Sequence, residues 1–148
     1  MKKIFFIVTF ILFLSACNSI KTVSYDIDFE NQEMQKEKES VLVTILQISD
    51  FHSNDFGEGE EKLLKKIQEA DPDLILFTGD IFDFEMTDEK ILKNVKSLLE
   101  GIKEIPFFYV SGNHEFYRGH SDDYAFLIED YGGQILNDKS LIFNLSKG

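Results

Sequence analysis

The sequence is poor in residues that cross-link or break a chain, because its 148 residues include one cysteine, two prolines and no tryptophan. With Cys17 as the single cysteine, an intrachain disulfide is excluded. Basic residues are also scarce, since 15 Lys and Arg stand against 27 Asp and Glu and give a formal net charge of −12. Binding a polyanion needs clustered Lys and Arg, so no nucleic-acid partner is expected. The length and a hydrophobic fraction of 43% suit one domain.

The first apolar run, Ile4 to Cys17, is too short to cross a bilayer as a helix, since it has 14 residues where roughly 20 are needed. Two lysines precede it and small residues close it, which is typical of an export signal over residues 1–16. The closing string Leu-Ser-Ala-Cys resembles the bacterial lipobox, which implies cleavage before Cys17 and lipidation of its thiol. The alternative is an ordinary signal peptide that Cys17 closes as a small apolar residue. Lipidation explains an unpaired exported thiol, so we expect a lipid-anchored protein on the extracytoplasmic face of a bacterial membrane.

A polar and charged segment, residues 17–40, follows the signal and contains neither Pro nor Gly. Within it, Val23 to Phe29 alternates apolar and polar residues with a period of two, which is typical of an edge strand. A solvated spacer that lifts the domain off the membrane explains the composition equally well. We therefore expect a tether with a possible edge strand.

From residue 41 onward, apolar runs alternate with amphipathic segments, an order typical of βαβ units. The pattern predicts an α/β fold with one domain over residues 41–148. Strands are expected at 41–49, 74–78 and 107–111, with short ones at 135–136 and 141–143, and helices at about 60–70, 88–103 and 124–131. The first of these helices ends at Asp71-Pro72, because proline cannot continue a helix.

Three short polar motifs each follow one of the longer predicted strands. They are Asp50-Phe51-His52, Gly79-Asp80-Ile81-Phe82-Asp83 and Gly112-Asn113-His114-Glu115. In open α/β sheets, ligands bind in the crevice outside the carboxyl ends of the strands, so these motifs should meet there. Carboxylate, imidazole and amide groups are the ligands of hard or borderline divalent ions. The sequence therefore predicts a metal site.

The spacing and chemistry of these residues suggest which could bind metal and which could donate a proton. Asp50 and His52 are two positions apart, so both can reach one cation from a loosely turning backbone. The carboxylate of Asp80 has two oxygens and could bridge two ions, while Asn113 offers an amide oxygen to the second. His114 could protonate a leaving alkoxide if a carboxylate fixes its tautomer.

These three motifs resemble the first three motifs of the calcineurin-like metallophosphoesterases. The stretch from Ile48 to Glu115 is most similar to the bacterial, membrane-associated phosphodiesterase branch. The resemblance implies the N-terminal half of an α/β/β/α sandwich, with a mixed, mostly parallel sheet and flanking helices. It also implies hydrolysis of a phosphate mono- or diester by a metal-bound hydroxide, with two divalent ions drawn from Mn²⁺, Fe²⁺ or Zn²⁺.

The resemblance assigns the metal ligands position by position. Asp50 and His52 correspond to ligands of the first ion, and Asp80 corresponds to the bridging carboxylate. Asn113 corresponds to a ligand of the second ion. The substrate implied by such a site is a phosphoester, and its further identity is left open.

The resemblance also assigns the acid chemistry. His114 corresponds to the catalytic acid, and Asp83 corresponds to the carboxylate that pairs with it. Glu115, the last residue of the third motif, is expected to support its loop rather than to bind metal.

Later motifs of the family supply a further histidine and a Gly-His-x-His string, and neither follows Glu115 in this sequence. The third histidine, His120, is interpreted as a loop residue. We therefore expect a C-terminally truncated domain, whose missing half belongs to a longer gene or to a partner. Two hypotheses follow: a lipid-anchored metallophosphoesterase, or a catalytically silent lipoprotein fragment or interaction module.

Overall fold

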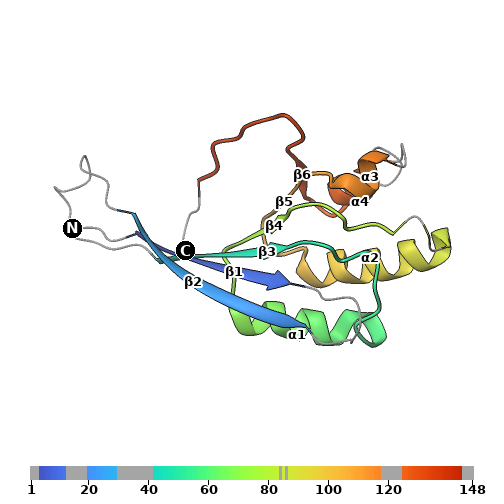
Figure 1. The fold of residues 1–148 in the computed structure, drawn as a ribbon, viewed down its shortest axis with the longest axis horizontal. Coiled ribbons are helices and arrows are strands. Elements are labelled where there is room, and N and C mark those ends of the chain that lie inside the picture. The colour runs from blue at the N-terminus through green and yellow to red at the C-terminus, as the bar shows by residue number, and fades with distance from the viewer. Residues whose placement is uncertain are drawn as a thin grey trace.

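In the computed structural model, the described residues are 4–12, 20–29, 42–83, 85, 87–117 and 125–144. They form one sheet of six strands in the order β2-β1-β3-β4-β5-β6, with helices beside it (Figure 1). The strands are β1 (Ile4–Leu12), β2 (Lys21–Phe29), β3 (Leu42–Ile48), β4 (Leu74–Phe77), β5 (Phe107–Tyr109) and β6 (Gln134–Ile135). The helices are α1 (Glu61–Ala70), α2 (Asp88–Ile102), α3 (Asn113–Tyr117) and α4 (Ala125–Asp130), with a 3₁₀ turn η2 at Glu58–Glu60. Cys17, His120 and residues 30–40 of the predicted tether lie outside the described residues.

The sheet is mostly parallel. Strands β1, β3, β4, β5 and β6 run in one direction, and β2 pairs antiparallel with β1. Strand β3 buries Val43 on one face and Leu46 and Ile48 on the other, as expected of a parallel strand that is covered on both sides. The predicted α/β class, with a mixed, mostly parallel sheet and flanking helices, is confirmed.

Helices α1 and α2 lie along the same side of the sheet (Figure 1). Each buries one apolar stripe, which includes Leu63 and Ile67 in α1 and Val95 and Leu98 in α2. The two helices approach closely at Gly101, where a Cβ atom would lie 2.4 Å from a methyl group of Leu64. The absence of a side chain at this position therefore permits the observed distance between the helices.

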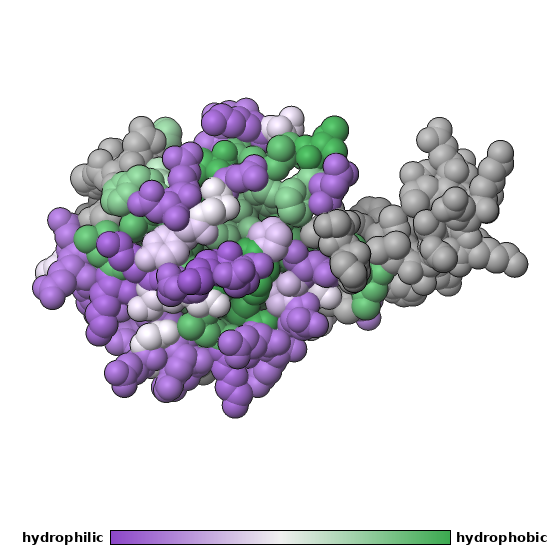
Figure 2. All heavy atoms as spheres, turned by 180° about the vertical axis from the view of Figure 1, so that it is seen from behind, coloured by the Kyte–Doolittle hydropathy of each residue, from purple (hydrophilic) through white to green (hydrophobic). Residues whose placement is uncertain are grey.

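Apolar side chains also reach the surface of the molecule. Seen from behind, apolar residues show between charged ones (Figure 2). The large apolar side chains exposed near the C-terminal end of the described chain are Leu141, Ile142 and Phe143. None of the described helices has the length and apolarity needed to cross a membrane.

The structure corrects the prediction at two places in the C-terminal part. The predicted strand at 141–143 is wrong, because β6 has only two residues and the chain turns at Asp138, which adopts a left-handed conformation with φ of 53°. Phe143 instead packs its ring against Phe108, with centroids 5.2 Å apart. Helix α3 was not predicted, since its five residues carry no apolar stripe.

Glu60 is a carboxyl group buried at the start of α1. It is 1% exposed, and its Oε2 accepts the backbone N–H of Phe56 at 3.0 Å, which closes the loop before the helix. Burial raises the pKa of Glu60 to about 7, an effect that outweighs the lowering by the hydrogen bond from Phe56.

We expect Glu60→Gln to remove part of the pH dependence of stability. The folded pKa of about 7 lies above the ordinary value of 4.5, so the folded chain keeps a proton that the unfolded chain releases. The free energy of unfolding should therefore fall as pH rises from 4.5 to 7 and level off above that. Urea unfolding across this range should give a shallower slope for Glu60→Gln than for wild type. Glu129→Gln, at an exposed position of α4, should keep the wild-type slope, and equal slopes in all three proteins would contradict the prediction.

Strand β1 falls within the predicted signal segment and occupies an inner position of the sheet. It pairs with β2 along nine residues and with β3 along seven. Strand β2 lies at the edge of the sheet and includes Val23 to Phe29, the segment whose alternation is typical of an edge strand. Cleavage before Cys17 would remove β1 and leave the facing backbone groups of β2 and β3 without partners, which is unfavourable.

We therefore expect β2 to move next to β3 in the processed chain. Val8 of β1 pairs with Tyr25 on one side and with Ile45 on the other, so closing the gap brings Tyr25 and Ile45 together. Two strand spacings of about 4.8 Å separate these residues now, which is beyond the reach of a disulfide, whereas one spacing is within it. Tyr25→Cys with Ile45→Cys, in a Cys17→Ser background, should cross-link in residues 17–148 but not in the full chain.

The matched control for this cross-link is Ser24→Cys with Ile45→Cys. Successive residues of a strand point to opposite faces, so this pair should not form a disulfide in either chain. Efficient cross-linking of Tyr25→Cys with Ile45→Cys in the full chain, or none in the processed chain, would contradict the expected pairing.

Candidate metal centre

The three motifs lie side by side at one end of the sheet. Each follows a parallel strand, in the neighbouring positions β3, β4 and β5. Backbone hydrogen bonds continue the pairing beyond the strands: the N–H of His52 donates to the C=O of Asp80 at 2.9 Å, and that of Ser53 to the C=O of Ile81 at 2.8 Å. We call this end of the sheet the motif end.

Two glycines allow the second and third motifs to touch. A Cβ atom on Gly79 would lie 2.5 Å from the Cα of Gly112, and one on Gly112 would lie 2.2 Å from the Oδ1 of Asp80. Gly79 also has a φ of 99°, which other residues rarely adopt. The backbones of the two motifs can therefore pack against each other only without side chains at these positions.

The predicted ligands themselves adopt a costly backbone conformation. Asp50, His52 and Asp80 have φ values of 56°, 50° and 55°, in the left-handed region that few residues other than glycine enter. Such conformations persist where the surrounding structure holds them, and they cluster at functional sites. The motif end therefore has the backbone features of a binding site.

The structure brings three ligand side chains together at the motif end. His52, Asp80 and His114 each offer a ligand atom within 4.8 Å of the others. The two imidazole rings are 4.5 Å apart between centroids and inclined at 66°. Atoms that bind one ion at about 2.1 Å are at most about 4.2 Å apart, so small side-chain rotations would let the three share an ion. Two imidazoles and a carboxylate fit Zn²⁺, Fe²⁺ or Mn²⁺.

Two further predicted ligands flank this cluster. The Oδ1 of Asp50 lies 3.8 Å from the Nε2 of His52, and the other carboxylate oxygen accepts the hydroxyl of Ser49. Asn113 begins α3 and is exposed. It lines a pocket of about 570 Å³ together with Val110, Ser111, Gly112, Phe116, Asn137 and Asp138. Asp50 is thus beside the first ligand, and Asn113 opens onto a space that could admit a ligand.

Asp83, the predicted partner of His114, forms hydrogen bonds with neighbouring loop residues. Its Oδ1 accepts the N–H of Glu85 at 2.9 Å, and its own N–H donates to the hydroxyl of Ser53 at 3.2 Å. It is not among the clustered ligand groups, so its pairing with His114 stays a prediction.

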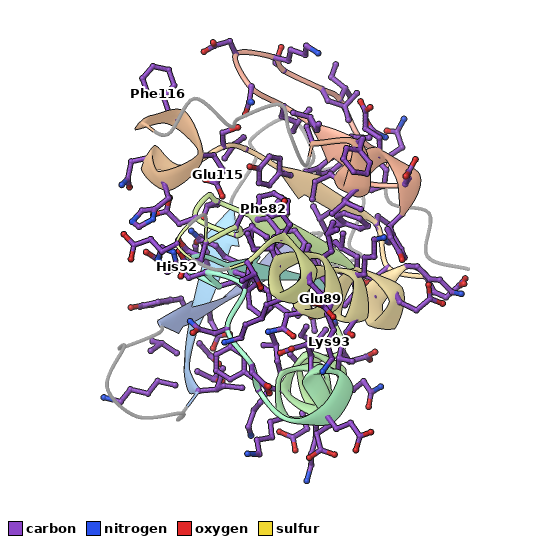
Figure 3. All side chains as sticks on the ribbon, turned by 90° about the vertical axis from the view of Figure 1, so that its right-hand side faces the viewer. His52, Phe82, Glu89, Lys93, Glu115 and Phe116 are labelled. Carbon is purple, nitrogen blue, oxygen red and sulfur yellow. The ribbon has the colours of Figure 1, made fainter. Side chains whose placement is uncertain are left out.

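Glu115 supports the loops, as expected. Its side chain is fully buried and accepts four backbone N–H groups, from Asp80 at 3.0 Å, Ile81 at 2.8 Å, Phe82 at 3.1 Å and Gly112 at 2.8 Å. Asp80 in turn accepts the N–H of His114 at 2.9 Å through Oδ1. The two acidic residues therefore lock the second and third motifs together, and Figure 3 shows Glu115 on the same left-hand part of the view as Phe116 and His52.

The motif loops also depend on polar residues that sequence reasoning missed. Ser53 is buried, and its C=O accepts the side-chain N–H of Asn94 from α2 at 2.8 Å. Asn94 lies within the buried apolar stripe of α2. A polar residue in an apolar stripe is the signal from which its buried hydrogen bond could have been predicted. Beneath the loops, burial and then the charge of Glu115 raise the pKa of Tyr109, so its hydroxyl stays neutral.

Comparison with known proteins agrees with this arrangement. The profile of the calcineurin-like phosphoesterase family matches residues 43–146. The chain belongs to this family. Residues 1–18 match the prokaryotic membrane lipoprotein lipid attachment site, which confirms the predicted lipoprotein and makes the chain a lipid-anchored membrane protein.

Two similar proteins are named as metallophosphoesterases. The chain is 29% identical over 135 residues to the uncharacterized metallophosphoesterase Cj0846 of Campylobacter jejuni. The matched region covers 89% of this chain and 34% of that protein. It is 26% identical over 99 residues to an uncharacterized metallophosphoesterase of Helicobacter pylori, covering 64% of this chain and 24% of that protein. The chain thus spans about a third or less of the length of these relatives.

We expect Glu115→Gln to weaken Mn²⁺ binding by about tenfold to hundredfold, the usual effect of losing a group that orients metal ligands. The amide of Gln presents donors to N–H groups that need acceptors, so Asp80 and His114 should lose their fixed positions. Isothermal titration with Mn²⁺, beside urea unfolding without metal, measures the two effects separately.

Glu60→Gln is the matched control, because Glu60 is also buried and also accepts a backbone N–H. Its Mn²⁺ affinity should remain within about twofold of wild type, since its neighbours are not metal ligands. If Glu115→Gln lowers the free energy of unfolding but binds Mn²⁺ as tightly as wild type, the carboxylate does not position the ligands.

Proposed function

We propose that this protein hydrolyses a phosphate mono- or diester with the help of divalent ions held at the motif end. The observation that carries the proposal is the cluster of His52, Asp80 and His114, whose ligand atoms lie within 4.8 Å of one another. Membership of the calcineurin-like phosphoesterases supports the reaction class.

In this proposal, Asp50 and His52 would hold a first ion, Asp80 would bind both ions, and Asn113 would contribute to the second. The donor set of carboxylates, imidazole and amide fits Mn²⁺, Fe²⁺ or Zn²⁺. When bound, two such ions supply an activated water and neutralise charge on the phosphoryl oxygens. The protein's part is to hold the ligands in place, which the hydrogen bonds of Glu115 support.

His114 is proposed as the proton donor to the leaving oxygen, with Asp83 as the carboxylate that fixes its tautomer. Its backbone is held by the hydrogen bond from its N–H to Asp80, and its ring is partly buried beside His52. The same proximity makes His114 a possible metal ligand in place of an acid. Removal of the imidazole would lower metal affinity if His114 is a ligand and would leave it unchanged if His114 is the acid.

The lipid anchor sets where the reaction takes place. With the lipid attached at Cys17, we propose that the domain lies on the extracytoplasmic face of the membrane.

The test is Mn²⁺-dependent hydrolysis of bis-p-nitrophenyl phosphate by residues 17–148, beside His114→Ala and Asp80→Ala. We expect a metal-dependent rate for wild type and a loss of about 100-fold or more for His114→Ala, the usual contribution of a general acid. Mn²⁺ affinity should be retained in His114→Ala and lost in Asp80→Ala.

His120→Ala is the matched control, because it removes the histidine that lies outside the three motifs. Its rate should equal that of wild type. Equal background rates in wild type and His114→Ala would contradict the proposal and favour the silent lipoprotein. Loss of Mn²⁺ affinity in His114→Ala would instead make His114 a ligand.

A further inference from the structure

The start of β2 lies at the motif end of the sheet. Lys21, its first residue, pairs with Leu12 of β1, and the preceding residue of β1, Ile11, pairs with Ile48, the last residue of β3. Asp50 follows Ile48 by two positions. Because β2 is antiparallel to the other strands, its start stays at this end whether it pairs with β1 or with β3.

The lipid is attached close to this point. Cys17, the single cysteine of the lipid attachment site, precedes Lys21 by four residues. A fully extended chain of four residues spans at most about 14 Å. The start of β2 is therefore held within about 14 Å of the anchored residue, whatever path the intervening residues take.

The opposite end of the sheet cannot reach the membrane in the same way. Strand β2 has nine residues, so its far end, Phe29, is about 27 Å from Lys21. This is roughly twice the span of residues 17–21, the short tether that joins the lipid to β2. A domain turned over, with the opposite end against the lipid, would stretch the tether beyond its limit.

The net charge of the chain does not favour contact with lipid, but an exposed aromatic side chain at the motif end does. The net charge of −12 repels anionic lipid, so the anchor and not electrostatic attraction determines the orientation. Phe116, in the helix that carries Asn113 and His114, is 73% exposed, and an exposed aromatic ring is favourable at a membrane interface. Figure 3 views the molecule from the motif end, with His52 and Phe116 both in sight.

We infer that the motif end faces the membrane that holds the lipid anchor, and that the substrate is a phosphoester in the headgroup layer of that same membrane. The substrate part of this inference rests on the proposed function, whereas the orientation part rests on the tether length and the direction of β2. A short tether then raises the local concentration of lipid substrate at the metal centre.

Orientation is tested by energy transfer to headgroup-labelled acceptor lipid in phosphatidylcholine vesicles that carry the lipidated protein. Donor dyes are placed on Asp55→Cys, at the motif end, and on Glu104→Cys, before β5 at the opposite end; both positions are exposed and outside the proposed site. Transfer should be stronger from position 55 than from 104. Insertion of a Gly-Ser spacer of about 20 residues after Ser19 should remove the difference, because such a linker is flexible and long.

Substrate source is tested with the same proteins on two substrates: a headgroup phosphodiester within the vesicle, and soluble bis-p-nitrophenyl phosphate. The spacer should lower lipid hydrolysis by about tenfold or more and leave soluble hydrolysis unchanged. Equal transfer from both dyes, or stronger transfer from 104, would overturn the orientation. A spacer with no effect on lipid hydrolysis would overturn the substrate source. Absence of hydrolysis of either substrate contradicts the proposed function, whereas the transfer measurement still decides the orientation.

Discussion

The close contact between the loops after β4 and β5 is the constraint on which the candidate metal centre depends. Parallel pairing of the strands brings three loop starts to one end of the sheet, but it does not bring their side chains within reach of one ion. That last approach requires the backbones of Gly79 and Gly112 to touch, and the buried carboxylate of Glu115 then ties both loops by four backbone hydrogen bonds. Asp80 and His114 owe their relative position to this contact.

The motif end combines local strain with strong support. Three ligand residues adopt left-handed backbone conformations, each of which costs free energy on its own. The hydrogen bonds from Asn94 to Ser53 and from the loop N–H groups to Glu115 offset that cost from outside the site. The candidate ligands are thereby held in a defined arrangement, which a metal-assisted reaction would need from the protein.

Much of the fold could be predicted from the sequence, because apolar runs and helical stripes are local signals. β3, β4, α1 and α2 begin and end within two residues of the predicted bounds. The motifs could be placed at strand ends for the same reason. The hydrogen bonds from the second motif to Glu115 and from Asn94 to Ser53 could not be predicted one by one, since they join residues 33 to 41 positions apart through tertiary packing. The short helix α3 and the turn at Asp138, which ends the sheet, lack any periodic pattern.

The position of β1 has a consequence for biogenesis. The same residues, Ile4–Leu12, are apolar enough to direct export and extended enough to fill a place between β2 and β3. A signal segment that already forms a strand of a sheet is not accessible to the translocation and processing machinery. Residues 4–12 of one molecule therefore cannot be the inner strand β1 and the export signal at the same time. Under the proposed export, the precursor would have to cross the membrane before its sheet forms, and the order of translocation, cleavage and folding would decide which strand becomes the neighbour of β3.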